Sequence, residues 1–230
     1  MNQTTQMHKI ARELGEFDVH FTPYYADGLI ELLRRAGLMD FTIIGKRWRA
    51  QCLRYLREHH LSLDLGGQRG PYDLVLTCTD LFIPDNVRAA PGLLVQEGMT
   101  DPENWVFRVV QRYPWFPRYL ASTSATGLSH WYQKFCVASD GYRELFAKKG
   151  VDPGKIVVTG IPNFDDCARY SNNDFPHRGY ALVCSSDARE TFKLHDRKAF
   201  LEQAVRLARG RKLLFKLQYE LINHPPDRVG

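Results

Sequence analysis

The sequence has few cysteines, and their arrangement fits neither a metal site nor a set of disulfides. The chain of 230 residues contains five of them: Cys52, Cys78, Cys136, Cys167 and Cys184. No two have the spacing of zinc ligands, and an odd number at wide separations does not form a disulfide framework. Several lie in apolar runs, where cysteine behaves as a small buried hydrophobe. The pattern predicts no metal site and a reduced, cytoplasmic setting.

Long apolar runs and a strong charge of either sign are also missing. No apolar stretch approaches the roughly 20 residues of a membrane-spanning helix, and the polar start 1–6 does not read as a secretory signal. Lys and Arg total 31 against 26 Asp and Glu, a formal net charge of +5. The densest basic group, Lys46–Arg57, is typical of a solvated helix face, so no nucleic-acid partner is expected. Mild positive charge suits an anionic nucleotide, and peripheral membrane association and oligomerisation stay open.

What the sequence does contain is a regular alternation of strands and helices. The apolar patterns predict strands at 19–22, 41–45, 74–77, 93–96, 136–138 and 156–158, and helices at 4–14, 28–36 and 47–60. A further helix lies between Ser139, which is placed to cap its start, and Gly150, which ends it. Strands alternating with helices favour a parallel α/β sheet with right-handed crossovers. Thr159-Gly160-Ile161-Pro162 then leaves the last strand at the edge where such sheets bind ligands.

A domain boundary is expected after residue 168. Residues 169–179 are polar and rich in turn formers, which predicts a linker. Beyond it the pattern predicts a strand at 180–184, a helix at 196–208 and a strand at 213–217. A second domain of about 50 residues, 180–230, is too small to bury a full core.

One stretch carries a family resemblance. Gly150-Val151, Lys155-Ile156 and Val158–Pro162 match the ending "x-GV-x-x-x-KI-x-VTG-x-P". This ending resembles that of the N-terminal domain in GT-B-type sugar-nucleotide enzymes, which include UDP-N-acetylglucosamine 2-epimerases, many glycosyltransferases and CDP-glycerol glycerophosphotransferases. The resemblance covers about residues 2–217. It implies a Rossmann-like parallel sheet of a GT-B N-terminal domain, 1–168, followed by an incomplete C-terminal nucleotide-binding domain.

Two carboxylates follow neighbouring predicted strands. Asp80 ends YDLVLTCTD, and Glu97 follows LLVQ. At one sheet edge such a pair can work as acid and base; alternatively, Asp80 caps a turn and Glu97 caps a helix or pairs with an arginine. YDLVLTCTD resembles the epimerase motif "PDLVLVHGDT" and LLVQEGMT resembles "HVEAGLRT", which implies that both carboxylates belong to an active site.

Departures from the epimerase motifs distinguish between the epimerase and transferase activities of these families. The epimerase histidine before Glu97 is replaced by Val95, a third glutamate falls on Gln111, and the "HREN"-like motif is replaced by 185–190. Phe215-Lys216-Leu217 is similar to the "FKLHP" strand end of glycerophosphotransferase-like proteins. The resemblance therefore favours transfer of a sugar or glycerophosphate group, with an epimerase-like isomerase as the alternative.

For a transferase, the resemblance implies Asp80 or Glu97 as the base and a UDP- or CDP-linked donor with a hydroxyl acceptor, without a tightly bound cofactor. The expected donor- or substrate-binding residues are Asn2, Gln3, Thr4, Gly98, Met99, Thr100, Ser139, Asp140, Thr159, Gly160, Pro162, Ser185, Ser186 and Lys216.

A third alternative is a non-catalytic binding or assembly protein on the same scaffold. Residues 105–131 are rich in aromatics, which we expect mainly in the core but which would form an interface in that case. The resemblance also implies that a first strand before residue 2 and most of the second domain are missing. We therefore expect little catalytic activity from this chain alone, and an unpaired strand edge in the first domain.

Overall fold

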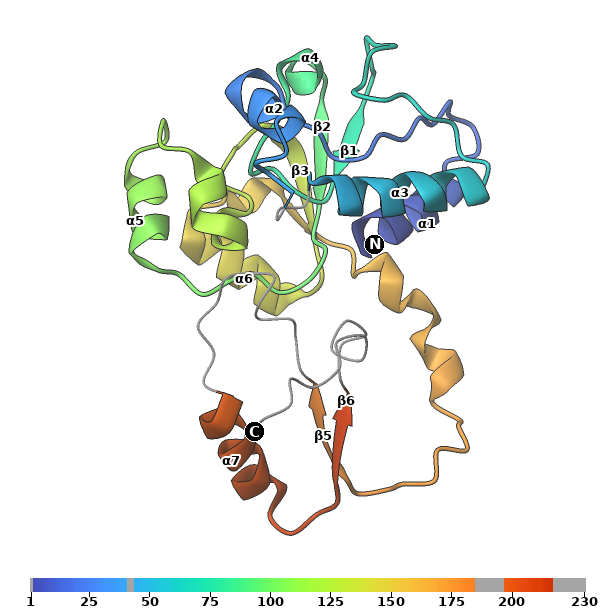
Figure 1. The fold of residues 1–230 in the computed structure, drawn as a ribbon, viewed down its shortest axis with the longest axis vertical. Helices are drawn as coiled ribbons and strands as arrows, with labels where there is room; N and C mark the ends of the chain where they lie inside the picture. The colour runs from blue at the N-terminus through green and yellow to red at the C-terminus, as the bar shows by residue number, and fades with distance from the viewer. Residues whose placement is uncertain (1, 41–43, 185–196, 217–230) are drawn as a thin grey trace. The chain divides into compact units, whose positions relative to one another are not determined.

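The computed structural model describes residues 2–40, 44–184 and 197–216 (Figure 1). The chain divides into two compact units, Met1–Ala168 and Arg169–Gly230. The first unit is α/β and contains a four-stranded sheet in the order β1-β2-β3-β4. Its strands are β1 (Val75–Thr77), β2 (Gly92–Val95), β3 (Tyr132–Val137) and β4 (Ile156–Val158). All three neighbouring pairs are parallel, as the alternating pattern predicts.

Helices cover this sheet and connect its strands (Figure 1). The α-helices of the first unit are α1 (Asn2–Arg12), α2 (Gly28–Arg35), α3 (Lys46–Glu58), α4 (Asp85–Arg88), α5 (Trp105–Arg112) and α6 (Asp140–Lys149). Three 3-10 segments complete it: η1 (Arg118–Ala125), η2 (Pro153–Lys155) and η3 (Pro162–Tyr170), the last of which runs past the unit boundary.

The region around α6 follows local sequence rules closely. The Ser139 side chain accepts a hydrogen bond from the Tyr142 amide, which caps the start of the helix. Gly150 ends it in the left-handed conformation with φ 105°, which a residue without a Cβ adopts at little cost. The apolar face of α6 packs through Phe146 into the main core, whose buried members are Leu94, Tyr132, Phe135, Val137, Phe146, Val151 and Ile156. Local capping and long-range burial agree here, so the predicted strand–helix–strand unit is confirmed.

Three expectations need correction or fall outside the described residues. The predicted strand 19–22 is reduced to one bridge, between Phe21 and Leu63, because only Ser62 and Asp64 exchange backbone hydrogen bonds with Phe21. Most of the predicted strand 41–45 lies outside the described residues. The aromatics of 105–131 do not all enter the core: Phe107 is buried, but Trp105 and Trp115 are 74% and 78% exposed.

The second unit contains a parallel pair, β5 (Ala181–Cys184) and β6 (Leu213–Lys216), joined through α7 (Arg197–Ala208). These elements agree with the strand, helix and strand predicted from the pattern. Residues 169–179, which the sequence marks as a linker, belong to this unit by their contacts.

Candidate functional site

The candidate site lies at the carboxyl ends of the parallel strands in the first unit. In open α/β sheets, ligands bind at this edge because loops and helix N-termini converge there. Here the converging parts are the residues after β2, the N-cap of α6 after β3, the loop after β4, and the first turn of α1 (Figure 1).

Glu97 and Gln3 form the clearest pair at this edge. The Gln3 amide nitrogen donates to Glu97 Oε2 at 2.7 Å, so the start of α1 holds the carboxylate that follows β2. Both side chains are half-buried. The thiol of Cys78, just past β1, lies close enough for the Glu97 charge to act on it: burial first, and then this charge, raise the pKa of Cys78 to about 12. Glu97 therefore lies where the ends of β1 and β2 meet.

Two glutamines that the motif analysis missed support this pair. Gln96 is buried, and its side chain accepts from the Ala138 amide at 2.9 Å and donates to the Gly98 carbonyl at 2.8 Å. Gln6 on α1 is also buried and donates to the Gln96 carbonyl at 2.8 Å. These bonds tie the loop after β2 to α1 and to the end of β3. A signal was present in the sequence, since Gln6 is a polar residue within the apolar face of the predicted helix.

Asp80 does not face the edge. Its side chain is fully buried, at 0% exposed, and its carboxylate accepts hydrogen bonds from the Gly127 amide at 2.9 and 3.1 Å and from the Ser129 amide at 3.1 Å. These partners stand just before β3, so the chain after β1 turns back into the interior. The expectation that Asp80 and Glu97 share a solvent-accessible cleft is wrong for Asp80. The geometry matches the alternative in which this carboxylate caps a turn.

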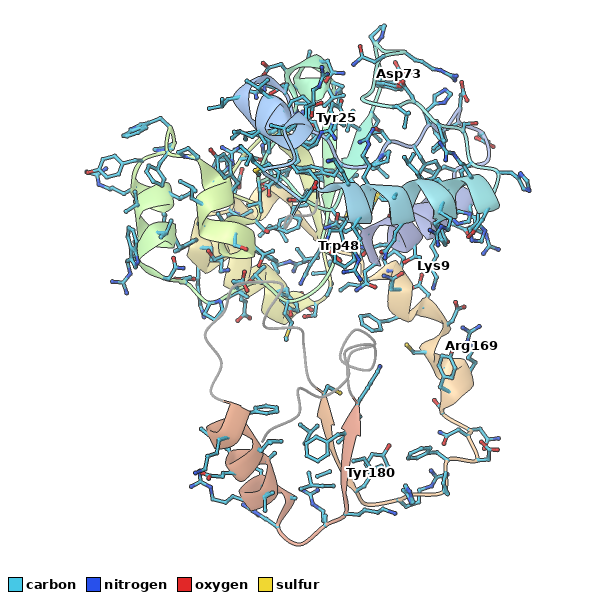
Figure 2. The ribbon with its side chains drawn as sticks, in the orientation of Figure 1. Lys9, Tyr25, Trp48, Asp73, Arg169 and Tyr180 are labelled. Atoms are coloured by element: carbon cyan, nitrogen blue, oxygen red, sulfur yellow. The ribbon has the colours of Figure 1, made fainter. Side chains whose placement is uncertain are left out.

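The loop after β4 meets the end of β3 and the side of α1. The amides of Thr159 and Gly160 both donate to the Val137 carbonyl, at 3.0 and 3.2 Å. Gly160 has φ 82°, and a Cβ added there would meet no atom within 4 Å, so the space above it is open. Lys9 on α1 donates to the Pro162 carbonyl at 3.0 Å, and Figure 2 shows it beside the start of η3.

The remaining predicted residues have mixed environments. Asn2 uses its carbonyl to accept from Asn163 at 3.4 Å, and the Thr4 hydroxyl contacts the Cys52 sulfur at 3.3 Å. Asp140, in the first turn of α6, pairs with Arg143 at 3.1 Å. Gly98 has open space around it, and Met99 is 87% exposed. Ser185 and Ser186 lie outside the described residues, and Lys216 ends β6 in the second unit.

Lys149 is a buried cation next to this loop. Its amine donates to Thr100 Oγ1 at 3.0 Å and to the Ser124 carbonyl at 3.2 Å, and the side chain is almost fully buried. Burial lowers the pKa of Lys149, against the opposing effect of Glu103 and Asp101. Thr100 is thus held by the last turn of α6, which leaves Gly98 and Met99 as the exposed part of the loop.

Gln111 stands where the epimerase resemblance places a third glutamate. Its side-chain amide donates to the Lys149 carbonyl at 2.9 Å, which ties α5 to the end of α6. The residue therefore contacts the helix end and contributes no carboxylate to the edge.

Comparison of the chain with models of protein families, with curated proteins and with solved structures finds no match. Within the described ranges, no helix combines the length and the apolar character needed to cross a membrane. No group of three or more His, Cys, Asp or Glu side chains within the described residues could hold a metal ion.

Proposed function

We propose that the protein is a GT-B-like transferase that binds a nucleotide-activated sugar or glycerophosphate donor and uses Glu97 as its base. The observation that carries this proposal is the position of Glu97. Gln3 occupies one carboxylate oxygen, Oε2, and no hydrogen bond within the described residues uses the other, Oε1. A half-buried carboxylate with one oxygen held and one available can accept a proton from a hydroxyl of an acceptor.

The donor side of the proposal rests on the parts around Glu97. The capped start of α6 at Ser139 presents amide groups, and helix N-termini favour phosphate groups. Gly160 leaves open space beside the same edge. Asp80 is left out of the proposed chemistry, because its carboxylate is already saturated by backbone amides.

The test is binding of UDP-N-acetylglucosamine and of CDP-glycerol, followed by amide chemical shifts in the full chain. We expect shifts at Glu97, Ser139 and Gly160. Glu97→Gln should keep these shifts, because the amide still accepts from Gln3, and should lower any transfer rate about 10²- to 10⁴-fold, the range of a lost general base. Shifts confined to other regions would contradict the proposal, and so would a wild-type transfer rate that Glu97→Gln leaves unchanged.

A binding or assembly role is the second candidate, favoured by the exposed aromatics of α5 and the turn after it. Trp105 and Trp115 are largely exposed, and Tyr113 and Tyr119 are about half exposed. Large exposed aromatics are enriched at interfaces. Trp105→Ser with Trp115→Ser should abolish concentration-dependent association in sedimentation if this surface binds a partner copy, and should leave donor-induced shifts intact.

A further inference from the structure

β1 lies at the edge of the sheet, and its outer backbone groups face a large cavity. In the order β1-β2-β3-β4, no described strand pairs with the outer side of β1. The Val75 amide donates to the Pro91 carbonyl, so Val75 and Thr77 direct their backbone groups toward β2. In a parallel ladder the residues between them direct theirs the other way. Leu76 therefore presents its N–H and C=O to the outer side.

The cavity beside β1 is lined by two segments of the chain. Its volume is about 990 Å³, and its lining includes every residue of 71–78 and every residue of 17–25. Successive residues of an extended chain point to opposite faces, so a cavity that touches all of them runs along the chain's edge. A strand of five residues fills a slab about 16 Å long, 4.8 Å wide and 10 Å deep, or roughly 800 Å³. We call this cavity the β1 slot.

The two walls of the β1 slot run in the same direction, and side chains connect them before and after β1. The ring of His20 lies 6.4 Å from that of Tyr72, before β1, and the Tyr24 hydroxyl donates to the Phe82 carbonyl, after it. These long side chains span the space between the two walls. Among the described residues, no backbone β-bridge joins 17–25 to 71–78. In Figure 2, Asp73 marks the approach to β1 and Tyr25 the end of the other wall.

The roof of the β1 slot is the apolar face of α1. Met7 and Ile10 of this helix line the slot, as does Leu14 two residues after it, yet none of the three is buried, and Gln6 is the one buried residue of the helix. An amphipathic helix normally buries its apolar stripe against a sheet. The β1 slot therefore combines an apolar roof with a row of backbone donors and acceptors, which suits an extended polypeptide better than a lipid or a small apolar molecule.

We propose that the β1 slot binds one extended, apolar peptide strand, which pairs in parallel with β1 and continues the β1-β2-β3-β4 ladder. Both walls and all paired strands of the sheet run in one direction, which sets the parallel orientation. Addition of a strand to an exposed sheet edge is an established way of binding peptides. The bound strand would also pack under α1, whose first turn holds Glu97 through Gln3.

The probe is a synthetic peptide with the centre Thr-Val-Ile-Val-Thr flanked by lysines, added to the full chain. Hydrogen exchange of the Leu76 amide should slow by about tenfold, because an open amide gains a ladder hydrogen bond, while Val75, already bonded to Pro91, changes less. The control peptide replaces the central Ile by Pro, which cannot donate to the ladder and should not bind.

Two variants separate the slot from other surfaces. Ala11→Trp places an indole in the β1 slot and should abolish binding, whereas Glu13→Gln, on the exposed end of the same helical region, should not. Equal binding of the two peptides, protection at sites other than Leu76, or no binding at all would overturn the proposal. Protection of Leu76 that rises with protein concentration alone would also overturn it, since the occupant would then be a second copy of this chain.

Discussion

Replacement of Asp80 by Asn separates its structural role from a catalytic one. The carboxylate serves the buried Gly127 amide and the half-buried Ser129 amide from a side chain that is 0% exposed. Asn removes the negative charge and offers one acceptor oxygen in place of two. With that oxygen in the place of Oδ2 both amides keep an acceptor, but the NH₂ group then faces the Gly127 amide in the place of Oδ1. A hydrogen bond to a charged group contributes about 1.5–3 kcal/mol, and a buried donor without a partner costs about 1–3 kcal/mol. We expect Asp80→Asn to lower the free energy of unfolding by about 2–4 kcal/mol.

The assay is urea unfolding followed by tryptophan fluorescence. All four tryptophans, Trp48, Trp105, Trp115 and Trp131, belong to the first unit, so this signal reports that unit alone. With a urea slope of about 2 kcal/mol per M, the midpoint should fall by about 1–2 M. The matched control is Asp140→Asn, which breaks an exposed pair with Arg143 and should cost less than about 1 kcal/mol. If Asp80→Asn unfolds like the wild type and instead loses turnover, the structural role is refuted.

Three further predictions concern backbone strain, pH and the loop after β2. Gly160→Ala should lower the free energy of unfolding by about 1–2 kcal/mol, because a φ of 82° strains a residue that has a Cβ. Gly98→Ala, in equally open space, should change the free energy of unfolding little, and urea unfolding measures both variants. Burial, and then the charges of His59 and Arg12, lower the pKa of His8 below its usual 6.5. The unfolded chain therefore binds this proton more readily than the folded protein does. The free energy of unfolding should fall as the pH drops through 6.5 toward the lowered pKa. Thermal unfolding between pH 7.5 and 5 should show this fall weakened in His8→Gln, and an unchanged slope would rule out the contribution. Gln96→Leu should raise the exchange rates of the Ala138 amide and disorder the exposed loop at Gly98, because its side chain bonds both, and unchanged exchange at Ala138 would contradict this.

The parts of the fold that sequence reasoning predicted well are those fixed by neighbours in the chain. The cap at Ser139, the stop at Gly150 and the apolar face that includes Phe146 all act within one helix, and each is found in the structure. The predicted strand at 19–22 failed for the opposite reason. A strand exists only with a partner, and there only Phe21 has one, a property that the residues themselves do not encode.

In the candidate site, too, the contacts that the sequence did not predict are those between residues far apart in the chain. The pair of Gln3 with Glu97 joins residues 94 positions apart, and that of Gln6 with Gln96 joins residues 90 apart. The sequence could place Glu97 at a strand end, but it could not say which helix would reach it. It also predicted that the aromatics of 105–131 lie mainly in the core, whereas Trp105 and Trp115 remain exposed and only Phe107, between them, turns inward among these three.

Asp80 and Glu97 show why a strand end alone does not define a site. Both residues follow parallel strands that are neighbours in the sheet, and the sequence motifs predicted a role in the active site for both. After β2, buried Gln96 bonds to the end of β3, which keeps Glu97 at the carboxyl edge. After β1, the chain instead enters the interior, where the residues before β3 supply amides to Asp80. A buried carboxylate needs such partners to remain charged. The amides that stabilise Asp80 are therefore the same groups that withdraw it from chemistry, and of these two carboxylates only that of Glu97 stays at the edge, where Gln3 holds one of its oxygens.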